Sequence, residues 1–218
     1  MKITDVKVYQ VKPRWIFVKV ITDKGIEGWG EMVSGTRTDT VIAGAHEMAE
    51  RFLIGENPFE IERLFQRMHR IFFRGGPVHG TLVSGFEMAL WDIKGKALDV
   101  PVYELLGGAV RDKLQVYTWI GGDRPEDVLE EAKAKYEQGF RAVKMNATEE
   151  LHYIDSFEKV DAAVERVASI REHFGNKMQI GIDFHGRVHK PMAKVLAKAL
   201  EPYRLMFIEE PVLPENEE

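Results

Sequence analysis

The sequence predicts an α+β amino-terminal domain followed by an α/β domain built from strand–helix repeats. Two short apolar segments, Met178–Phe184 and Leu205–Ile208, are each followed or ended by carboxylate residues. The segment 191–202 between them has apolar residues at helical spacing. Residues 2–32 instead alternate apolar and polar side chains, which is typical of antiparallel strands. These patterns place the boundary between the two domains near residue 112.

The pattern of residues 1–112 predicts a three-stranded meander followed by helices. This arrangement is an α+β capping domain. The expected strands are Ile3–Tyr9, Trp15–Ile21 and Ile26–Glu31, with a hairpin turn at 22–25. Helical patterns follow over 40–70 and 78–97, separated by the Gly-Gly-Pro turn at 75–77. Asp92 follows a tryptophan within the second pattern, and a structural role is favoured over a catalytic one.

Residues 113–218 predict alternating strands and helices. The expected strands are Leu114–Trp119, Ala142–Asn146, Met178–Phe184 and the segment from Leu205. Helices are expected between them, the first starting at Asp123 as its cap. Four such units are half of an eight-unit barrel, so the fold class is a truncated (β/α)8-type barrel behind the α+β domain.

Composition excludes several functional classes. The net charge of −5 gives no reason to expect nucleic acid or an anionic membrane surface as a partner. The sequence contains no cysteine, which excludes disulfide and thiolate chemistry and makes a cytoplasmic location the default expectation. The first residues enter a strand directly, without the pattern of a signal peptide. No apolar run of roughly eighteen residues is present.

Carboxylates stand at the ends of two neighbouring predicted strands. Asp183 and Glu209 would lie side by side at the carboxyl-terminal rim, where barrel active sites are built. Two uncompensated carboxylates repel each other, and oxygen ligands of this kind suit Mg²⁺. His185, two residues after Asp183, points to the same side of the strand. The alternative is a hydrogen-bonded rim acid without a metal, because an isolated Asp-x-His pair is a weak motif.

Several motifs together resemble one known family. They are Asp-Phe-His-Gly-Arg at 183–187, Ile-Glu-Glu-Pro at 208–211, Gly-Trp-Gly-Glu at 28–31, Arg-Gly-Gly-Pro at 74–77 and Ala-Leu-Trp-Asp-Ile-Lys-Gly-Lys at 89–96. The Gly-Gly-Asp-Arg-Pro run at 121–125 belongs with them. The chain resembles the enolase superfamily, in the mandelate-racemase-like branch that contains acid-sugar dehydratases. The resemblance runs from Met1 to Glu218.

The resemblance implies a Mg²⁺-assisted dehydration of an aldonic acid to a 2-keto-3-deoxy acid. Asp183 and Glu209 would be metal ligands, and His185 would be the general acid that protonates the departing hydroxyl. Racemases of the superfamily carry lysine-x-lysine on the second barrel strand. Here the second lysine is replaced by Asn146, which cannot accept a proton and is expected to orient the substrate. Lys144 could lie near the carboxylates that bind the metal, or it could be a cation at the rim without a catalytic role.

Some questions stay open at the level of the sequence. Arg37, in the polar loop 33–39, is the cation best placed to bind the substrate, but a solvated loop arginine is an equally good interpretation. The third metal ligand and the general base that the resemblance implies are not found before Glu218. We therefore expect a fragment that is inactive alone, in an enzyme that forms a homo-oligomer. A non-catalytic scaffold is the alternative, and the choice among aldonic acids is not fixed.

Overall fold

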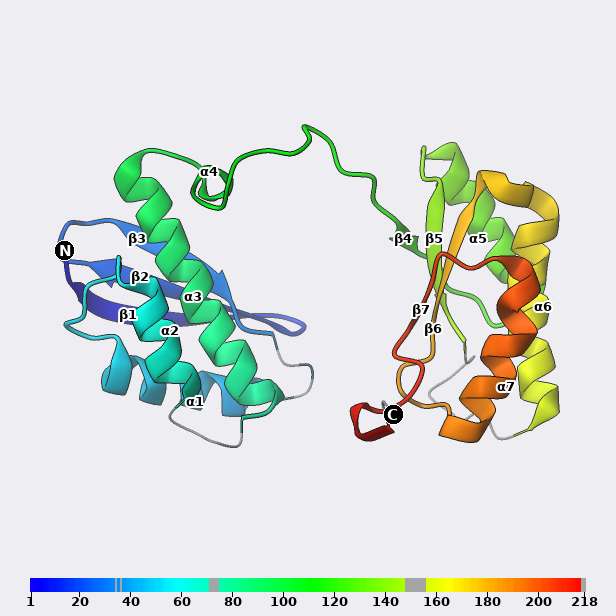
Figure 1. The fold of residues 1–218 in the computed structure, drawn as a ribbon, viewed down its shortest axis with the longest axis horizontal. Helices are drawn as coiled ribbons and strands as arrows, with labels where there is room; N and C mark the ends of the chain where they lie inside the picture. The colour runs from blue at the N-terminus through cyan, green and yellow to red at the C-terminus, as the bar shows by residue number, and fades with distance from the viewer. Residues whose placement is uncertain (34, 36, 71–74, 148–155, 217–218) are drawn as a thin grey trace. The chain divides into compact units, whose positions relative to one another are not determined.

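The computed structural model describes residues 1–33, 35, 37–70, 75–147 and 156–216 (Figure 1). These residues form two compact units, Met1–Asp112 and Lys113–Glu218, which are described separately. Arg74 of the Arg-Gly-Gly-Pro motif lies outside the described residues, as does part of the predicted loop 33–39. No helix in the described ranges is both long and apolar enough to cross a membrane.

The first unit contains the predicted antiparallel meander. Its strands are β1 (Ile3–Val11), β2 (Trp15–Thr22) and β3 (Glu27–Glu31), in the order β1-β2-β3. The turn between β2 and β3 is closed by the Gly25 N–H, which donates to the Thr22 carbonyl at 3.1 Å. Gly25 has φ +73°, a conformation that favours glycine.

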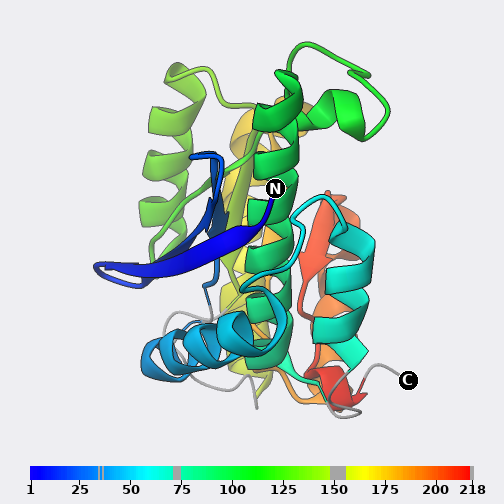
Figure 2. The same ribbon diagram turned by 90° about the vertical axis from the view of Figure 1, so that its left-hand side faces the viewer.

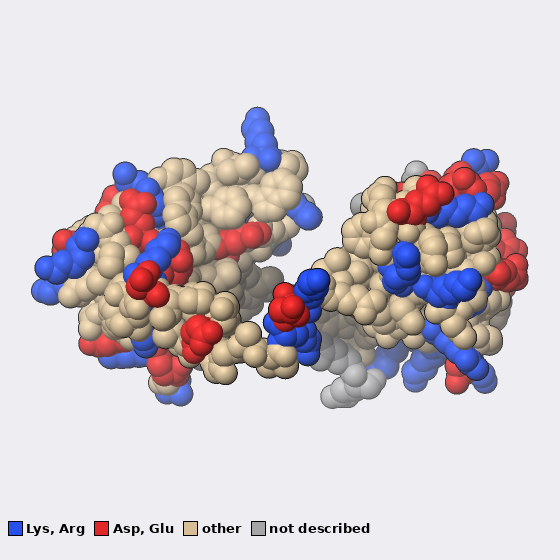
Figure 3. Space-filling view, turned by 90° about the horizontal axis from the view of Figure 1, so that it is seen from above, with Lys and Arg blue, Asp and Glu red and all other residues tan. Residues whose placement is uncertain are grey.

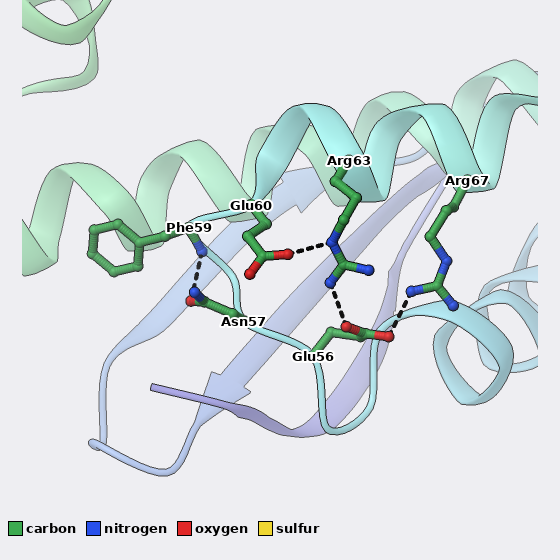
Figure 4. Close-up of polar contacts among 6 residues, drawn as sticks. All are labelled: Glu56, Asn57, Phe59, Glu60, Arg63 and Arg67. Atoms are coloured by element: carbon green, nitrogen blue, oxygen red, sulfur yellow. Dashed lines mark hydrogen bonds and ion pairs between the residues drawn. The ribbon is translucent and has the colours of Figure 1, made fainter.

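Among the residues described, the helices that follow the meander are α1 (Thr38–Phe52), α2 (Ile61–Arg70), α3 (Pro77–Leu98) and the short α4 (Val102–Leu105). The helical pattern expected over 40–70 is therefore interrupted. The break at 53–60 contains Gly55 at φ +83° and Pro58, both unfavourable in a helix interior. Figure 4 shows how Glu56 ties this break to α2, because its carboxylate accepts hydrogen bonds from Arg63 and Arg67.

Helix α3 packs closely against β2 and β3 (Figures 1 and 2). Two glycines of β3 make this approach possible. A Cβ atom at Gly28 would lie 2.0 Å from the Ala89 carbonyl oxygen, and one at Gly30 would lie 1.9 Å from the Gly85 carbonyl oxygen. Asp92 of α3 accepts the Trp29 backbone N–H at 2.9 Å, which supports its structural interpretation.

The second unit is a four-stranded parallel sheet with helices between the strands, as predicted. The strands are β4 (Thr118–Trp119), β5 (Ala142–Asn146), β6 (Gln179–Asp183) and β7 (Phe207–Glu209), in the order β4-β5-β6-β7. The helices are α5 (Pro125–Glu137), α6 (Phe157–Phe174) and α7 (Lys190–Leu200). Three-residue 3₁₀ turns, η1 to η3, occur at Gly175–Lys177, Glu201–Tyr203 and Pro214–Asn216.

Two boundaries in this unit differ from the sequence prediction. Strand β4 was expected from Leu114, but only Thr118 and Trp119 pair with β5, so the preceding residues form no ladder. Helix α5 was expected to be capped by Asp123. It begins at Pro125 after Arg124, and no side chain caps it. The Asp123 carbonyl instead accepts a hydrogen bond from Arg166.

The two faces of the parallel sheet differ in chemistry. Val143, Met145, Ile180 and Ile182 point toward the helices and form a buried core with them. The alternate positions of the same strands carry Lys144, Asn146, Gly181, Asp183, Phe207 and Glu209. Figure 1 shows α5, α6 and α7 together on the apolar side. These three helices therefore do not cover the polar face of the sheet.

Candidate active site

Strand register brings three polar side chains side by side at the carboxyl-terminal rim of the sheet. Asn146 pairs with Asp183 across β5 and β6, and Asp183 pairs with Glu209 across β6 and β7. Residues paired in a parallel ladder point to the same face. Asp183 is almost fully buried, whereas the Glu209 side chain is 38% exposed. The rim therefore has a buried and an accessible carboxylate next to each other.

Lys144 links these two carboxylates. Its ammonium lies 2.7 Å from Asp183 Oδ2 and 3.1 Å from Glu209 Oε2. Burial acts to lower the pKa of Lys144, but its hydrogen bonds to Asp183 and Glu209 raise it, and the balance lies above the ordinary lysine value. The sequence left open whether Lys144 lies near the two carboxylates. The structure shows that it does.

His185 contacts the same aspartate through its backbone and its ring. Its backbone N–H donates to Asp183 Oδ1 at 2.8 Å, and its Nε2 lies 3.2 Å from Asp183 Oδ2. The turn that allows this is left-handed, with φ +52° at His185 and +62° at Gly186. Hydrogen bonds from the Phe184 and Gly186 N–H groups to the carbonyls of Glu209 and Glu210 fix it. The imidazole is thus held at the rim beside Asp183.

Asn146 completes the row from the other side. Its Oδ1 is buried and has no hydrogen-bond partner among the described residues. A buried amide oxygen without a donor is costly, and such groups are often found where a ligand binds. The end of β5 is held in place by the Ala147 N–H, which donates to the Asp183 carbonyl at 2.8 Å.

Arg166 of α6 is a buried residue of this region that the sequence analysis did not identify. Its guanidinium donates to the carbonyls of Ala147 and Asp123, which follow β5 and precede α5. The residue is 2% exposed. An arginine on an amphipathic helix usually lies in solvent, so the sequence offers no signal for this role. Arg166 fixes the backbone that carries Asn146.

Below the rim the sheet face becomes aromatic. The Phe207 ring lies over Gly181, where a Cβ atom would be 2.5 Å from a ring carbon. The Tyr117 ring lies 5.4 Å from that of Phe207. Gly181 is therefore needed for the ring to cross the sheet directly beneath the carboxylates.

The donor set suits a hard divalent cation. Asp183 and Glu209 already converge on one positive charge, that of Lys144, and carboxylate oxygens are the ligands that Mg²⁺ prefers. Within the described ranges, no group of three His, Asp or Glu side chains could hold a metal ion. Two carboxylates are thus a partial ligand set.

Arg37, the remaining predicted site residue, lies elsewhere. Arg37 belongs to the first unit, where it is exposed and immediately precedes α1. It lines an open cavity of about 460 Å³ with residues of α1 and α3. Figure 3 shows acidic and basic residues interspersed over each unit, so neither presents a field of one sign on that side.

Comparison with known sequences places this arrangement in a family. The mandelate racemase / muconate lactonizing enzyme N-terminal domain matches residues 6–107, and the enolase C-terminal domain-like family matches residues 127–218. The chain belongs to the mandelate racemase/muconate lactonizing enzyme family of the enolase superfamily. The predicted resemblance is confirmed, and it extends over both units.

Two relatives of the chain are named D-galactonate dehydratase. The chain is 56% identical to a D-galactonate dehydratase of Ralstonia pickettii and 54% identical to one of Pectobacterium atrosepticum. Each alignment covers 100% of this chain and 57% of the relative, so the chain spans little more than half of their length.

Solved structures of the family share the fold. A mandelate racemase/muconate lactonizing enzyme from Jannaschia sp. has a TM-score of 0.91 at 31% identity. An enolase from Pantoea ananatis with bound D-gluconate and Mg has a TM-score of 0.90 at 30% identity. The alignments cover 99% of this chain and 62% and 61% of those chains.

Proposed function

We propose that the protein to which this chain belongs is a Mg²⁺-dependent acid-sugar dehydratase, and that D-galactonate is its substrate. The proposal rests chiefly on one observation: Asp183 and Glu209 converge on a single cation, and His185 lies against the same aspartate. The names of the relatives at 54–56% identity support the choice of galactonate. The parallel sheet would form the first half of a (β/α)8-type barrel.

Asp183 and Glu209 would hold the metal. When bound, Mg²⁺ would make the substrate's α-proton more acidic by neutralising the charge that develops on its carboxylate group. The third ligand and the general base are expected from parts of the protein other than these 218 residues. For that reason the isolated chain is expected to be inactive.

His185 would act as the general acid. Hydroxide is a poor leaving group unless it is protonated as it departs, and an imidazole is suited to this near neutral pH. The left-handed turn at His185 and Gly186 holds the imidazole at the rim, and the imidazole would donate a ring proton to the departing β-hydroxyl.

Asn146 and Arg37 would bind the substrate. The unpaired Asn146 Oδ1 could accept a hydrogen bond from a sugar hydroxyl, which would remove the cost of an unsatisfied buried oxygen. Because Asn146 stands where racemases carry a basic lysine, dehydration is favoured over racemisation. Arg37 would bind the carboxylate or hydroxyls from the first unit. We also propose that the complete enzyme is a homo-oligomer.

The test is a turnover assay on the full-length protein with Mg²⁺, which follows the 2-keto-3-deoxy acid product. Galactonate and gluconate are compared, since the Pantoea ananatis relative was solved with D-gluconate. We expect a higher kcat/KM for galactonate and no turnover in Asp183→Asn or Glu209→Gln. A higher kcat/KM for gluconate would make gluconate the proposed substrate. A fully active Asp183→Asn variant would refute the metal site.

The role of His185 is tested with a second substrate. His185→Asn should slow dehydration on the order of 10²–10⁴-fold, as expected for loss of a general acid. A substrate that carries fluoride in place of the departing hydroxyl needs little protonation to react. Its turnover should be less affected by the same substitution. An equal loss with both substrates would mean that His185 does not protonate the leaving group.

A further inference from the structure

Lys144 makes a contact that the dehydration mechanism does not require. Its ammonium bridges Asp183 Oδ2 and Glu209 Oε2, the carboxylates assigned to the metal. Asp183 Oδ1 already accepts the His185 backbone N–H. Both oxygens of Asp183 and one oxygen of Glu209 are therefore already in contact with protein donors.

We propose that Lys144 is a built-in counter-cation, which holds Asp183 and Glu209 together before Mg²⁺ binds and releases at least one of them when the metal arrives. The inference rests on the proposed Mg²⁺ site. Adjacent carboxylates repel each other at short range. Since the side chain of Asp183 is only 4% exposed, water screens it poorly, and an internal positive charge lowers the energy of the metal-free site.

The same geometry makes Lys144 a competitor of the metal. An ammonium at hydrogen-bond distance from both oxygens and an Mg²⁺ ion bound to them would be close neighbours, and like charges repel. Wild-type protein should consequently bind Mg²⁺ more weakly than a variant without this charge. A rim lysine that only fills space would have no such effect on affinity.

Lys19 of the first unit supplies a matched control. Its side chain is 16% exposed, against 15% for Lys144, and it forms a 3.1 Å ion pair with one carboxylate, that of Glu27. Both lysines lie on the middle part of a strand. They differ in whether the partner carboxylates are proposed metal ligands.

The experiment measures Mg²⁺ affinity by calorimetry and metal-free melting temperature in the full-length protein. Lys144→Met is compared with Lys144→Gln, Lys144→Arg and Lys19→Met. We expect Lys144→Met and Lys144→Gln to melt lower without metal, to bind Mg²⁺ about tenfold more tightly, and to approach wild-type melting at saturating Mg²⁺. Lys144→Arg should keep an affinity near that of wild type. Lys19→Met should leave the affinity unchanged.

Each outcome decides a separate point. Unchanged or weaker Mg²⁺ binding in the two neutral Lys144 variants would overturn the inference, provided that wild-type binding is lost in Asp183→Asn. Wild-type protein that binds no Mg²⁺ would refute the proposed metal site, and this inference with it. In metal-free protein, adding Glu209→Gln to Lys144→Met should recover part of the lost melting temperature, because it removes the carboxylate repulsion. Further loss there would contradict the counter-cation role.

Discussion

The two sheets of this protein carry lysines of nearly equal burial in very different settings. In the antiparallel sheet, Lys19 faces one carboxylate, Glu27, and lies over the rings of Tyr9 and Trp29. In the parallel sheet, Lys144 faces two carboxylates. Charge is therefore balanced at the first site, whereas the second has one carboxylate more than its lysine can neutralise. An excess of carboxylate over lysine charge, with one of the carboxylates buried, distinguishes a place for a cation from an ordinary ion pair.

The sheets also use glycine differently. In the antiparallel sheet, Gly28 and Gly30 let the backbone of α3 approach. In the parallel sheet, Gly181 makes room for the Phe207 ring of the neighbouring strand. Backbone cannot move aside easily, but a ring at the half-buried end of a strand can. The first sheet should thus be the less tolerant of an added methyl group.

Gly30→Ala should have the largest effect on stability. The new Cβ atom would lie 1.9 Å from the Gly85 carbonyl oxygen, so α3 or β3 must shift. We expect a loss of about 3–5 kcal/mol in the free energy of unfolding of the first unit, measured by chemical denaturation. Gly80→Ala is the control, since nothing lies within 4 Å of its added Cβ atom. It should be neutral or slightly stabilising. A Gly30→Ala protein as stable as wild type would show that the helix is not held this closely.

Gly181→Ala should have a smaller effect on stability and a specific effect on the metal. The Cβ atom would lie 2.5 Å from a Phe207 ring carbon, so the ring must move and carry β7 with it. Glu209 is two residues further along β7, and its carboxylate should be displaced from Asp183. We expect a loss of about 1–3 kcal/mol and weaker Mg²⁺ binding, measured by denaturation and calorimetry.

A second substitution tests this explanation. Phe207→Leu shortens the side chain, so Gly181→Ala with Phe207→Leu should bind Mg²⁺ better than Gly181→Ala alone. If the double variant recovers nothing, contact between residue 181 and the ring is not what positions Glu209.

Residue patterns predicted much of this site. Asp183, His185 and Glu209 could be singled out because each stands where an apolar strand ends. The contact of Lys144 with both carboxylates depends on strand register across three strands, which the sequence does not encode locally. Arg166 could not be recognised because it differs from a surface arginine only in its buried partners.

The first unit shows a similar limit. Its three strands follow from alternation and turn residues, and the hydrogen bond from Trp29 supports the structural interpretation of Asp92. The helical pattern over 40–70 concealed the break at 53–60, where Gly55 and Pro58 were the available signals. In the second unit, the cap predicted at Asp123 was wrong, because α5 begins at Pro125 and Arg124 occupies the N-cap position.

Glu56→Gln should have the smallest effect on the free energy of unfolding. Glu56 belongs to a partly exposed network of ion pairs with Arg63 and Arg67. Hydrogen bonds from Arg63 and Arg67 hold the pKa of Glu56 below its ordinary value. The stabilisation is therefore present above the unfolded-state pKa and is lost as the pH falls through the lower folded-state value. We expect a loss of at most about 1 kcal/mol near neutral pH.

Thermal unfolding of wild type and Glu56→Gln over a series of pH values checks this. The two curves should converge in acid, below the ordinary glutamate pKa of about 4.3. Glu47→Gln, which removes an exposed helical pair with Arg51, should show a smaller difference throughout. A Glu56 effect that persists unchanged in acid would rule out the ion pairs as its cause.

The most direct test of the account is to locate the metal. Crystals of the full-length protein grown with Mn²⁺ in place of Mg²⁺ would give an anomalous signal at the ion. We predict a peak within metal–oxygen bonding distance of both Asp183 and Glu209, with the Lys144 ammonium displaced from at least one of them. A catalytically required Mn²⁺ bound elsewhere, with Lys144 still bridging the two carboxylates, would contradict it.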